Sequence, residues 1–136
     1  MFTQQFFTEW KEIKMAQKYQ IIQAVVSEGG QTVKMFDNLD KDYGYLTGIS
    51  VVDLYGYKAE ISHSSVDGKE LFPRGFDVLF IQTNNFVNPS ERFFGLEGIE
   101  AKGKRIDIEF KDGGIAQYPY TIKIFLRLEN KPKNGN

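Results

Sequence analysis

Cysteine is absent from the 136 residues, and histidine occurs only once, at His63. A chain without cysteine cannot form a disulfide, a thiolate nucleophile or a cysteine-ligated zinc or iron–sulfur site. One histidine also excludes a metal site built from two or three imidazoles of a single chain. We therefore expect no metal or cofactor, and we interpret His63 as a structural or solvated side chain.

An excess of charge of one sign and long apolar runs are also missing. Seventeen Lys and Arg stand against eighteen Asp and Glu, spread along the chain, and the formal net charge is −1. That balance does not favour direct contact with nucleic acid or with an anionic membrane. No stretch approaches the roughly 20 apolar residues that a membrane-spanning helix needs. Residues 1–12 lack the basic and apolar regions of a secretory signal, so we expect a soluble protein made in the cytoplasm.

Catalytic motifs are missing as well. His63 and Asp67 stand near several serines, but adjacent strand residues point to opposite faces, and nothing there resembles a nucleophile elbow. Asp107 and Glu109 could supply paired carboxylates, yet they share one strand face with Arg105, as solvated side chains do. The glycine pairs lack the spacing and the lysine of a phosphate-binding loop. The sequence therefore predicts a protein that is not an enzyme.

The clearest pattern that is present is the alternation in the last regular segment, residues 120–129. Every second side chain is apolar and most of those between are polar, which is typical of a strand with one face on a core. An aromatic content of 15% also favours a β-rich globular domain. Shorter segments of this kind recur upstream, separated by turn-forming residues. The pattern predicts eight strands, at residues 19–26, 31–36, 45–54, 57–62, 76–82, 92–96, 104–110 and 118–129.

These strands predict an all-β fold, an eight-stranded antiparallel β-sandwich with Greek-key connections. The Gly-rich residues 111–114 are typical of a hairpin, which would make the last two strands direct neighbours. The longer connections at residues 62–72 and 82–92 suit crossings between two sheets, and a mixture of hairpins and crossings is typical of a Greek key. We divide the chain into an N-terminal aromatic arm or helix (1–18), the β-sandwich (19–130) and a polar C-terminal tail (131–136).

The N-terminal arm carries large apolar side chains near helical spacing. The spacing predicts a short amphipathic helix over residues 3–17, and an extended arm is the alternative. Such aromatic side chains must be buried, either on the body of the same domain or in a neighbouring subunit. The residues that would make these contacts are Phe2, Phe6, Phe7, Trp10 and Ile13.

One loop gathers three carboxylates, from Asp37, Asp40 and Asp42. Clustered carboxylates suit calcium, but the later bidentate Glu of a helix–loop–helix calcium site is missing. We favour a solvated turn over a calcium site.

Four tyrosines could form an aromatic platform that stacks on sugar rings. Tyrosine is also common in ordinary strands and at sheet edges, which is the structural interpretation of the same residues. These tyrosines are Tyr43, Tyr45, Tyr55 and Tyr57.

Four segments, at residues 43–52, 71–76, 91–96 and 118–128, give the chain a resemblance to a known family. Together with the strand pattern and the aromatic arm, they resemble the single jelly-roll capsid proteins of tailless icosahedral viruses. In particular they are similar to the penton and minor capsid proteins of double-jelly-roll-lineage bacteriophages. The resemblance implies a single jelly roll that forms a homo-oligomer, a pentamer or a trimer, and that contacts other capsid proteins.

From this resemblance we expect a structural virion protein, a vertex (penton) or minor capsid subunit that acts by self-association and by docking to its neighbours. It would be synthesised in the host cytoplasm and reside in the virion, with its arm reaching under adjacent capsomers. The arm is aromatic and near neutral, which suggests a protein partner or a position close to an internal membrane and no direct binding of nucleic acid. The alternative is a carbohydrate-binding β-sandwich module that uses the four tyrosines.

Overall fold

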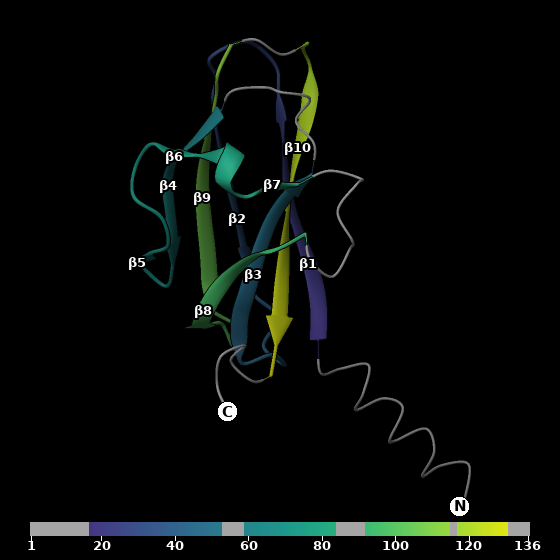
Figure 1. Ribbon diagram of the computed structural model, residues 1–136, viewed down its shortest axis with the longest axis vertical. Helices are drawn as coiled ribbons and strands as arrows, with labels where there is room; N and C mark the ends of the chain where they lie inside the picture. The colour runs from purple at the N-terminus through teal and green to yellow at the C-terminus, as the bar shows by residue number, and fades with distance from the viewer. Residues whose placement is uncertain (1–16, 53–58, 84–91, 115–116, 131–136) are drawn as a thin grey trace, which may run out of the picture.

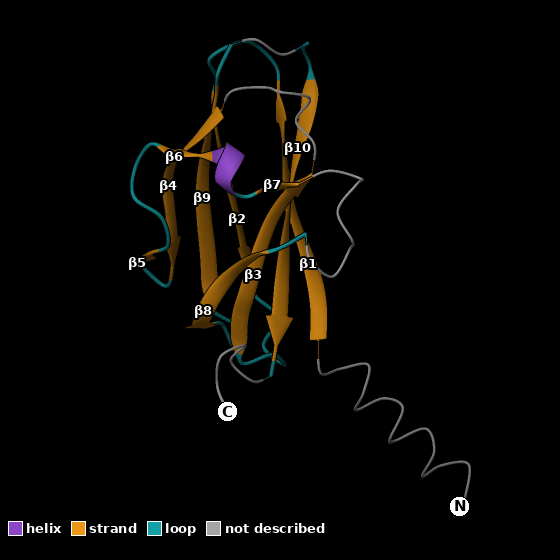
Figure 2. Ribbon diagram, viewed as in Figure 1, coloured by secondary structure: helices purple, strands orange, loops and turns teal. Residues whose placement is uncertain are grey.

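The computed structural model describes residues 17–52, 59–83, 92–114 and 117–130. Within these residues the fold is all-β, with ten strands and one short 3₁₀ helix, η1 (Figure 1, Figure 2). No helix in this part of the chain has the length and hydropathy needed to cross a bilayer. The expected all-β class is therefore confirmed. The elements are β1 (Gln17–Val26), β2 (Thr32–Asn38), β3 (Tyr45–Val52), β4 (Ala59–Val66), β5 (Lys69–Glu70), β6 (Phe76–Asp77), η1 (Val78–Phe80), β7 (Gln82–Thr83), β8 (Phe94–Glu100), β9 (Arg105–Asp112) and β10 (Tyr120–Glu129).

The strands form two five-stranded sheets. In the first sheet the order is β1, β10, β3 and β7, and β8 also pairs with β3. In the second sheet the order is β2, β9, β4 and β5, and β6 also pairs with β4. The pairs are antiparallel except for the short parallel pair between β3 and β7. Two sheets of this kind around one core are consistent with the expected β-sandwich.

The core lies between the sheets and is filled by alternate residues of the long strands. In β10 the alternate apolar residues at positions 122, 124, 126 and 128 are fully buried, which confirms the alternation seen in the sequence. The central strand of the second sheet, β9, contributes in the same way. The buried side chains of these two strands are Ile122, Ile124, Leu126 and Leu128 from β10, and Ile106, Ile108 and Phe110 from β9.

Residues 76–82, predicted as one strand, instead form β6, η1 and β7. β6 pairs with β4 in the second sheet, whereas β7 pairs with β3 in the first sheet. The side chain of Asp77 accepts a hydrogen bond from the amide of Leu79 at 2.9 Å and so caps η1, which ends β6. This segment is therefore a crossing between the two sheets.

The hairpin predicted between the last two strands is wrong. β9 pairs with β2 and β4 in the second sheet, whereas β10 pairs with β1 and β3 in the first sheet. Asp112 accounts for the difference, because its carboxylate accepts hydrogen bonds from the amides of Gly30 and Gly114 and from the hydroxyls of Tyr118 and Tyr120. These bonds hold the chain across the end of the sandwich instead of turning it back onto β9.

The two crossings predicted at the longer connections are also wrong. β4 turns back at Asp67 and Gly68, with φ angles of 52° and 78°, and pairs with β5 in the same sheet. Positive φ at both central residues is what a two-residue hairpin turn needs. At the second connection, β7 and β8 both pair with β3, so the chain returns to the first sheet.

Candidate interaction surfaces

Tyr43, one of the four tyrosines predicted to form a glycan platform, is buried in the hydrophobic core. Tyr45, the first residue of β3, is half-buried. A ring buried in the core does not offer its face to a sugar. The remaining predicted binding residues lie outside the described residues: Tyr55 and Tyr57, and in the arm Phe2, Phe6, Phe7, Trp10 and Ile13.

The three aspartates of the predicted turn make hydrogen bonds within the protein. Asp40 pairs with Lys18 and accepts a hydrogen bond from the amide of Asp42 at 2.9 Å. The bond from Lys18, followed by that amide, holds the pKa of Asp40 below its ordinary value, and the same side-chain bond raises the pKa of Lys18. Asp37 accepts a bond from Gln20 at 3.0 Å. Within the described ranges, no group of three or more acidic or histidine side chains is placed to hold a metal ion.

The outer face of β1 carries three exposed apolar side chains. β1 is an edge strand of the first sheet, and its inward residues Ile22 and Val26 are buried in the core. On its outward side the polar Gln17 and Gln23 are exposed, and the apolar Tyr19, Ile21 and Val25 are 48% to 54% exposed. Edge strands are usually protected by charges, prolines or bulges, because a long apolar edge attracts other chains. We call Tyr19, Ile21 and Val25 the β1 face.

Arg127 is buried beside the β1 face, on the outer side of β10, where it is only 5% exposed. The ring of Phe93 covers its guanidinium at 5.2 Å, and Tyr19 stacks on Phe93 with 5.2 Å between ring centroids. The guanidinium donates to the carbonyl and hydroxyl oxygens of Thr47 at 2.9 and 3.1 Å and lies 3.7 Å from Glu129. A buried charge with this many partners fixes the surface around it, since losing one partner leaves the charge uncompensated.

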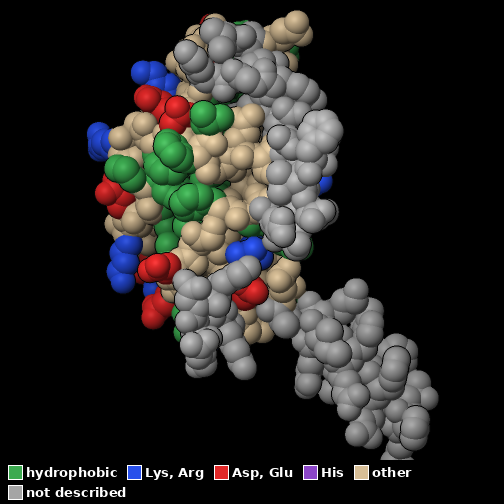
Figure 3. Space-filling view, viewed as in Figure 1, with side chains coloured by type: hydrophobic (Ala, Val, Ile, Leu, Met, Phe, Trp, Pro, Cys, Tyr) green, Lys and Arg blue, Asp and Glu red, His purple; other side chains and the backbone are tan. Residues whose placement is uncertain are grey.

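A cluster of aromatic side chains lies where β6, η1 and β8 meet. Phe72 and Phe76 stack with 4.3 Å between ring centroids, and Phe80 and Phe94 lie 5.6 and 6.4 Å from Phe76. Leu79 and Phe80 are each 70% exposed. Hydrophobic side chains gather in the middle of the face drawn in Figure 3. We call the partly buried Phe76 and the exposed Leu79, Phe80 and Phe94 together the aromatic cluster.

The outer face of the second sheet has a different character. Arg105 and Asp107 form an ion pair at 3.0 Å, and Lys34 and Glu109 form another at 3.6 Å. Phe36 is exposed on this face, but the guanidinium of Arg105 lies over its ring at 4.3 Å. This face is therefore charged, as a face open to water usually is, whereas the outer side of β1 carries large apolar side chains and no charge.

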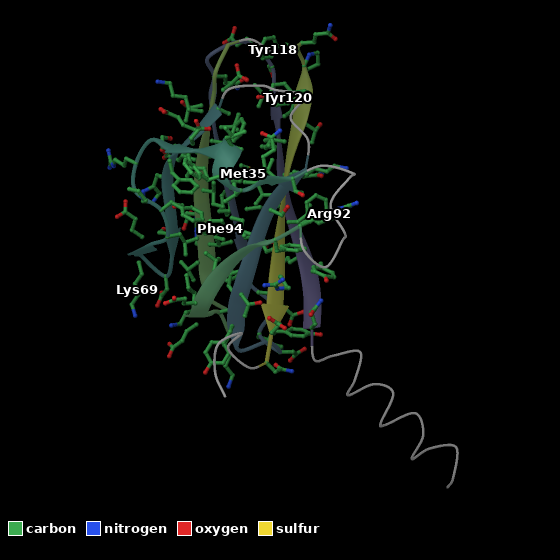
Figure 4. All side chains as sticks on the ribbon, viewed as in Figure 1. Met35, Lys69, Arg92, Phe94, Tyr118 and Tyr120 are labelled. Carbon is green, nitrogen blue, oxygen red and sulfur yellow. The ribbon has the colours of Figure 1, made fainter. Side chains whose placement is uncertain are left out.

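Asp112 joins the loops at one end of the sandwich, where Tyr118 and Tyr120 also lie (Figure 4). Its buried carboxylate accepts hydrogen bonds from the two tyrosine hydroxyls at 2.5 Å and from the amides of Gly30 and Gly114 at 3.0 and 2.8 Å. Burial by itself raises the pKa of Asp112, but these four hydrogen bonds outweigh it, so the pKa lies below its ordinary value. The carboxylate is therefore ionised and fully partnered.

A cavity of about 730 Å³ opens beside Asp112. Glu60, Asp77, Leu79 and Lys111 are among the residues that line it. The Asp112 carboxylate is held by four protein donors, and one carboxylate oxygen of Asp77 caps η1. Two carboxylates of the lining are thus already used by the fold, and we assign the cavity no ligand.

Sequence reasoning missed the aromatic cluster and Asp112. Residues 78–81 are four apolar residues in a row. Neighbouring residues of a strand point to opposite faces, so a strand with one face on the core cannot bury all four of these side chains. This run was therefore the available signal for exposed apolar side chains. Asp112 gave no comparable signal, because one of its donors, Gly30, lies 82 positions away in the sequence.

Comparison with protein family models, with curated proteins and with solved structures finds no match to this chain. The function therefore has to be inferred from the residues and their geometry. The β1 face and the aromatic cluster are the candidate interaction surfaces of the described residues.

Proposed function

We propose that this chain is a structural virion protein with a single jelly-roll fold. It acts as a vertex (penton) or minor capsid subunit, by self-association and by docking to other capsid proteins. The order in which the strands pair supports the fold, and the distribution of apolar side chains on the surface supports the role.

The pairing order follows one rule along the chain. The first strand pairs with the last, β1 with β10, the second pairs with the last but one, β2 with β9, and then β3 pairs with β8 and β4 with β6. These four pairs alternate between the two sheets. That is the arrangement obtained when one long antiparallel hairpin is rolled into a sandwich, and it supports a jelly-roll topology. Jelly rolls serve in viral capsids, lectins and cupins, so the fold alone leaves several functions open.

One observation carries the choice of a capsid role: large apolar side chains are exposed both on the β1 face and in the aromatic cluster. Exposed apolar patches on a soluble domain mark protein contacts, and a capsid subunit needs such contacts on more than one side. The charged outer face of the second sheet suits the side that meets solvent. A lectin would need an open sugar site, and the burial of Tyr43 weighs against one built on that tyrosine.

The N-terminal arm would supply the contact with other capsid proteins. Its large aromatic side chains are of the kind that carry most of the binding energy at interfaces. The arm precedes β1 directly, since β1 begins at Gln17, so it is tethered at the edge of the first sheet. An arm tethered there can reach a neighbour without disturbing the core.

Deletion of residues 2–13 tests this docking. The deleted chain should keep its circular dichroism spectrum and its thermal midpoint, because every described strand lies at or beyond Gln17. When it is co-expressed with the capsid proteins encoded in the same genome, it should be missing from purified particles. Incorporation at the level of the full chain would contradict the proposal.

Two full-length variants provide a matched control for the deletion. Replacing Phe6, Phe7 and Trp10 together with Ser removes the aromatic anchors and keeps the length, so this variant should also be lost from particles. Replacing the polar residues of the same stretch leaves the anchors in place, so that variant should be incorporated normally. Those polar residues are Glu9, Lys11 and Glu12.

A further inference from the structure

The β1 face and part of the aromatic cluster lie at different edges of the first sheet. β1 is one edge of the first sheet, and β7 and β8 form its other edge, with β10 and β3 between them. The cluster also includes β6 and η1, which lie to the left of β1 in Figure 1. The two surfaces are thus available to two different neighbours at the same time.

The exposed area is large enough to matter for association. Taking about 200 Å² for a fully exposed large side chain, the β1 face together with Leu79, Phe80 and Phe94 exposes about 650 Å² of apolar surface. A standard stable interface buries about 1,600 Å² in total, of which a little more than half is apolar. The two surfaces placed against each other would therefore supply most of the apolar part of such an interface, and their surroundings would supply the polar rim.

The arrangement of the surfaces favours contact between unlike patches. If two β1 faces met across a twofold axis, the aromatic cluster of both copies would stay exposed. If two aromatic clusters met, both β1 faces would stay exposed. Contact between the β1 face of one copy and the aromatic cluster of the next covers both surfaces in every copy with a single kind of interface.

We infer that copies of this chain associate head to tail, the β1 face of one docking on the aromatic cluster of the next, and that the contact closes into a ring. The inference rests on the self-association in the proposed function and deepens it by naming the two surfaces that meet. A heterologous contact is also what a trimer or pentamer requires, because contacts between identical patches join copies only in pairs.

Two variants disable one surface each. Ile21→Glu places a charge in the middle of the β1 face, and Phe80→Glu places one in the aromatic cluster. Both residues are exposed, so both variants should fold, which circular dichroism and the thermal midpoint check. Phe36→Glu is the matched control, since Phe36 is an exposed aromatic on the outer face of the second sheet, outside both surfaces. Val25→Glu replaces Ile21→Glu if the latter fails to fold.

The measurement is the mass in solution of each protein alone and of an equimolar mixture of the two variants. The wild type and Phe36→Glu should be rings of equal mass, and each of the other two variants should be a monomer. The mixture should form a species of two chains. Ile21→Glu keeps an intact aromatic cluster and Phe80→Glu keeps an intact β1 face, so these two surfaces can bind each other. The other surface of each chain carries the new charge, so no third chain can be added.

Three results would overturn the inference in distinguishable ways. If Phe80→Glu stays oligomeric while Ile21→Glu is monomeric, the β1 face pairs with itself. If both variants keep the wild-type mass, the interface lies elsewhere and the proposed self-association survives. If the mixture of two monomeric variants stays monomeric, the two surfaces do not bind each other, and the proposed self-association again survives. If the wild type itself is monomeric, the self-association in the proposed function fails together with the inference.

Discussion

Replacing Asp112 with Ala should destabilise the protein strongly. The substitution removes the acceptor of four hydrogen bonds that tie together the loop at Gly30, the turn at Gly114 and the start of β10. The carboxylate is buried, so water does not easily replace it as the partner of the two amides. The charge makes each of these bonds stronger than a bond between neutral groups.

The magnitude follows from the number of bonds and from their environment. A hydrogen bond to a charged group contributes about 1.5–3 kcal/mol, but four bonds to one carboxylate are not additive, and Tyr118 and Tyr120 are only partly buried. We expect Asp112→Ala to lower the free energy of unfolding by about 3–5 kcal/mol. Asp112→Asn keeps one acceptor oxygen but loses the charge, so we expect a smaller loss of about 1–2 kcal/mol.

The assay is urea denaturation at neutral pH, followed by circular dichroism. Asp107→Ala is the control, because this carboxylate lies on the exposed face of β9 in an ion pair with Arg105, and such pairs contribute less than about 1 kcal/mol. If Asp112→Ala costs no more than Asp107→Ala, the carboxylate does not hold the loops and the argument is wrong.

The same site predicts a pH dependence. The folded-state pKa of Asp112 is lowered, so its contribution to stability is fully present above the ordinary carboxyl pKa of about 3.9. That contribution is lost as the pH falls below this value and through the lowered pKa of the folded state. Asp112→Asn should therefore show a smaller loss of stability on acidification than the wild type, and equal losses would refute the assignment.

The remaining predictions concern the packing of the two sheets. A Cβ at Gly48 would lie 3.0 Å from both the guanidinium carbon of Arg127 and the Cβ of Phe93, so Gly48→Ala should cost about 1–3 kcal/mol in urea denaturation, and an unchanged midpoint would refute this packing. Phe110 is fully buried at the centre of β9, so Phe110→Ala should cost about 3–5 kcal/mol, and a cost below about 1 kcal/mol would contradict its place in the core. Lys18 is exposed, and Lys18→Ala removes its ion pair with Asp40. A double-mutant cycle with Asp40→Ala should give a coupling energy below about 1 kcal/mol, and a coupling energy of several kcal/mol would contradict this.

The parts of the fold that the sequence predicted are those encoded by local alternation. β10 alternates over ten residues, and its apolar side is buried as predicted. β9 is recognisable for the same reason. A strand with one face on a core carries this information in its own residues, whichever strands become its neighbours.

The connections could not be predicted in this way. The Gly-rich turn after β9 has the composition of a hairpin. The chain nevertheless crosses to the other sheet, and Asp112, just before the turn, accepts hydrogen bonds from Gly30, Tyr118 and Tyr120. The composition of a turn shows that the backbone can turn there, but it does not show which strand the next segment will pair with. The same limit explains why residues 76–82 were predicted as one strand, although Asp77 caps a helical turn there.

The candidate site shows a similar division. Arg127 is one of the polar residues between the apolar positions of β10, and the alternation alone predicts such a residue on the face away from the core. In the structure Phe93 covers it, and Phe93 comes from a segment more than thirty residues earlier in the chain. Exposure on the outer face of a sheet depends on which distant segment crosses that face, so it follows from the fold and not from the strand's own pattern.

The mass of the full chain in solution, measured by light scattering over a range of concentrations, tests the central claim most directly. The proposed capsid role predicts a closed oligomer of three or five copies of the 15.6 kDa chain, with a mass that stays constant once the ring has formed. A mass of 15.6 kDa at every concentration would contradict self-association, and with it the assembly role proposed for the β1 face and the aromatic cluster.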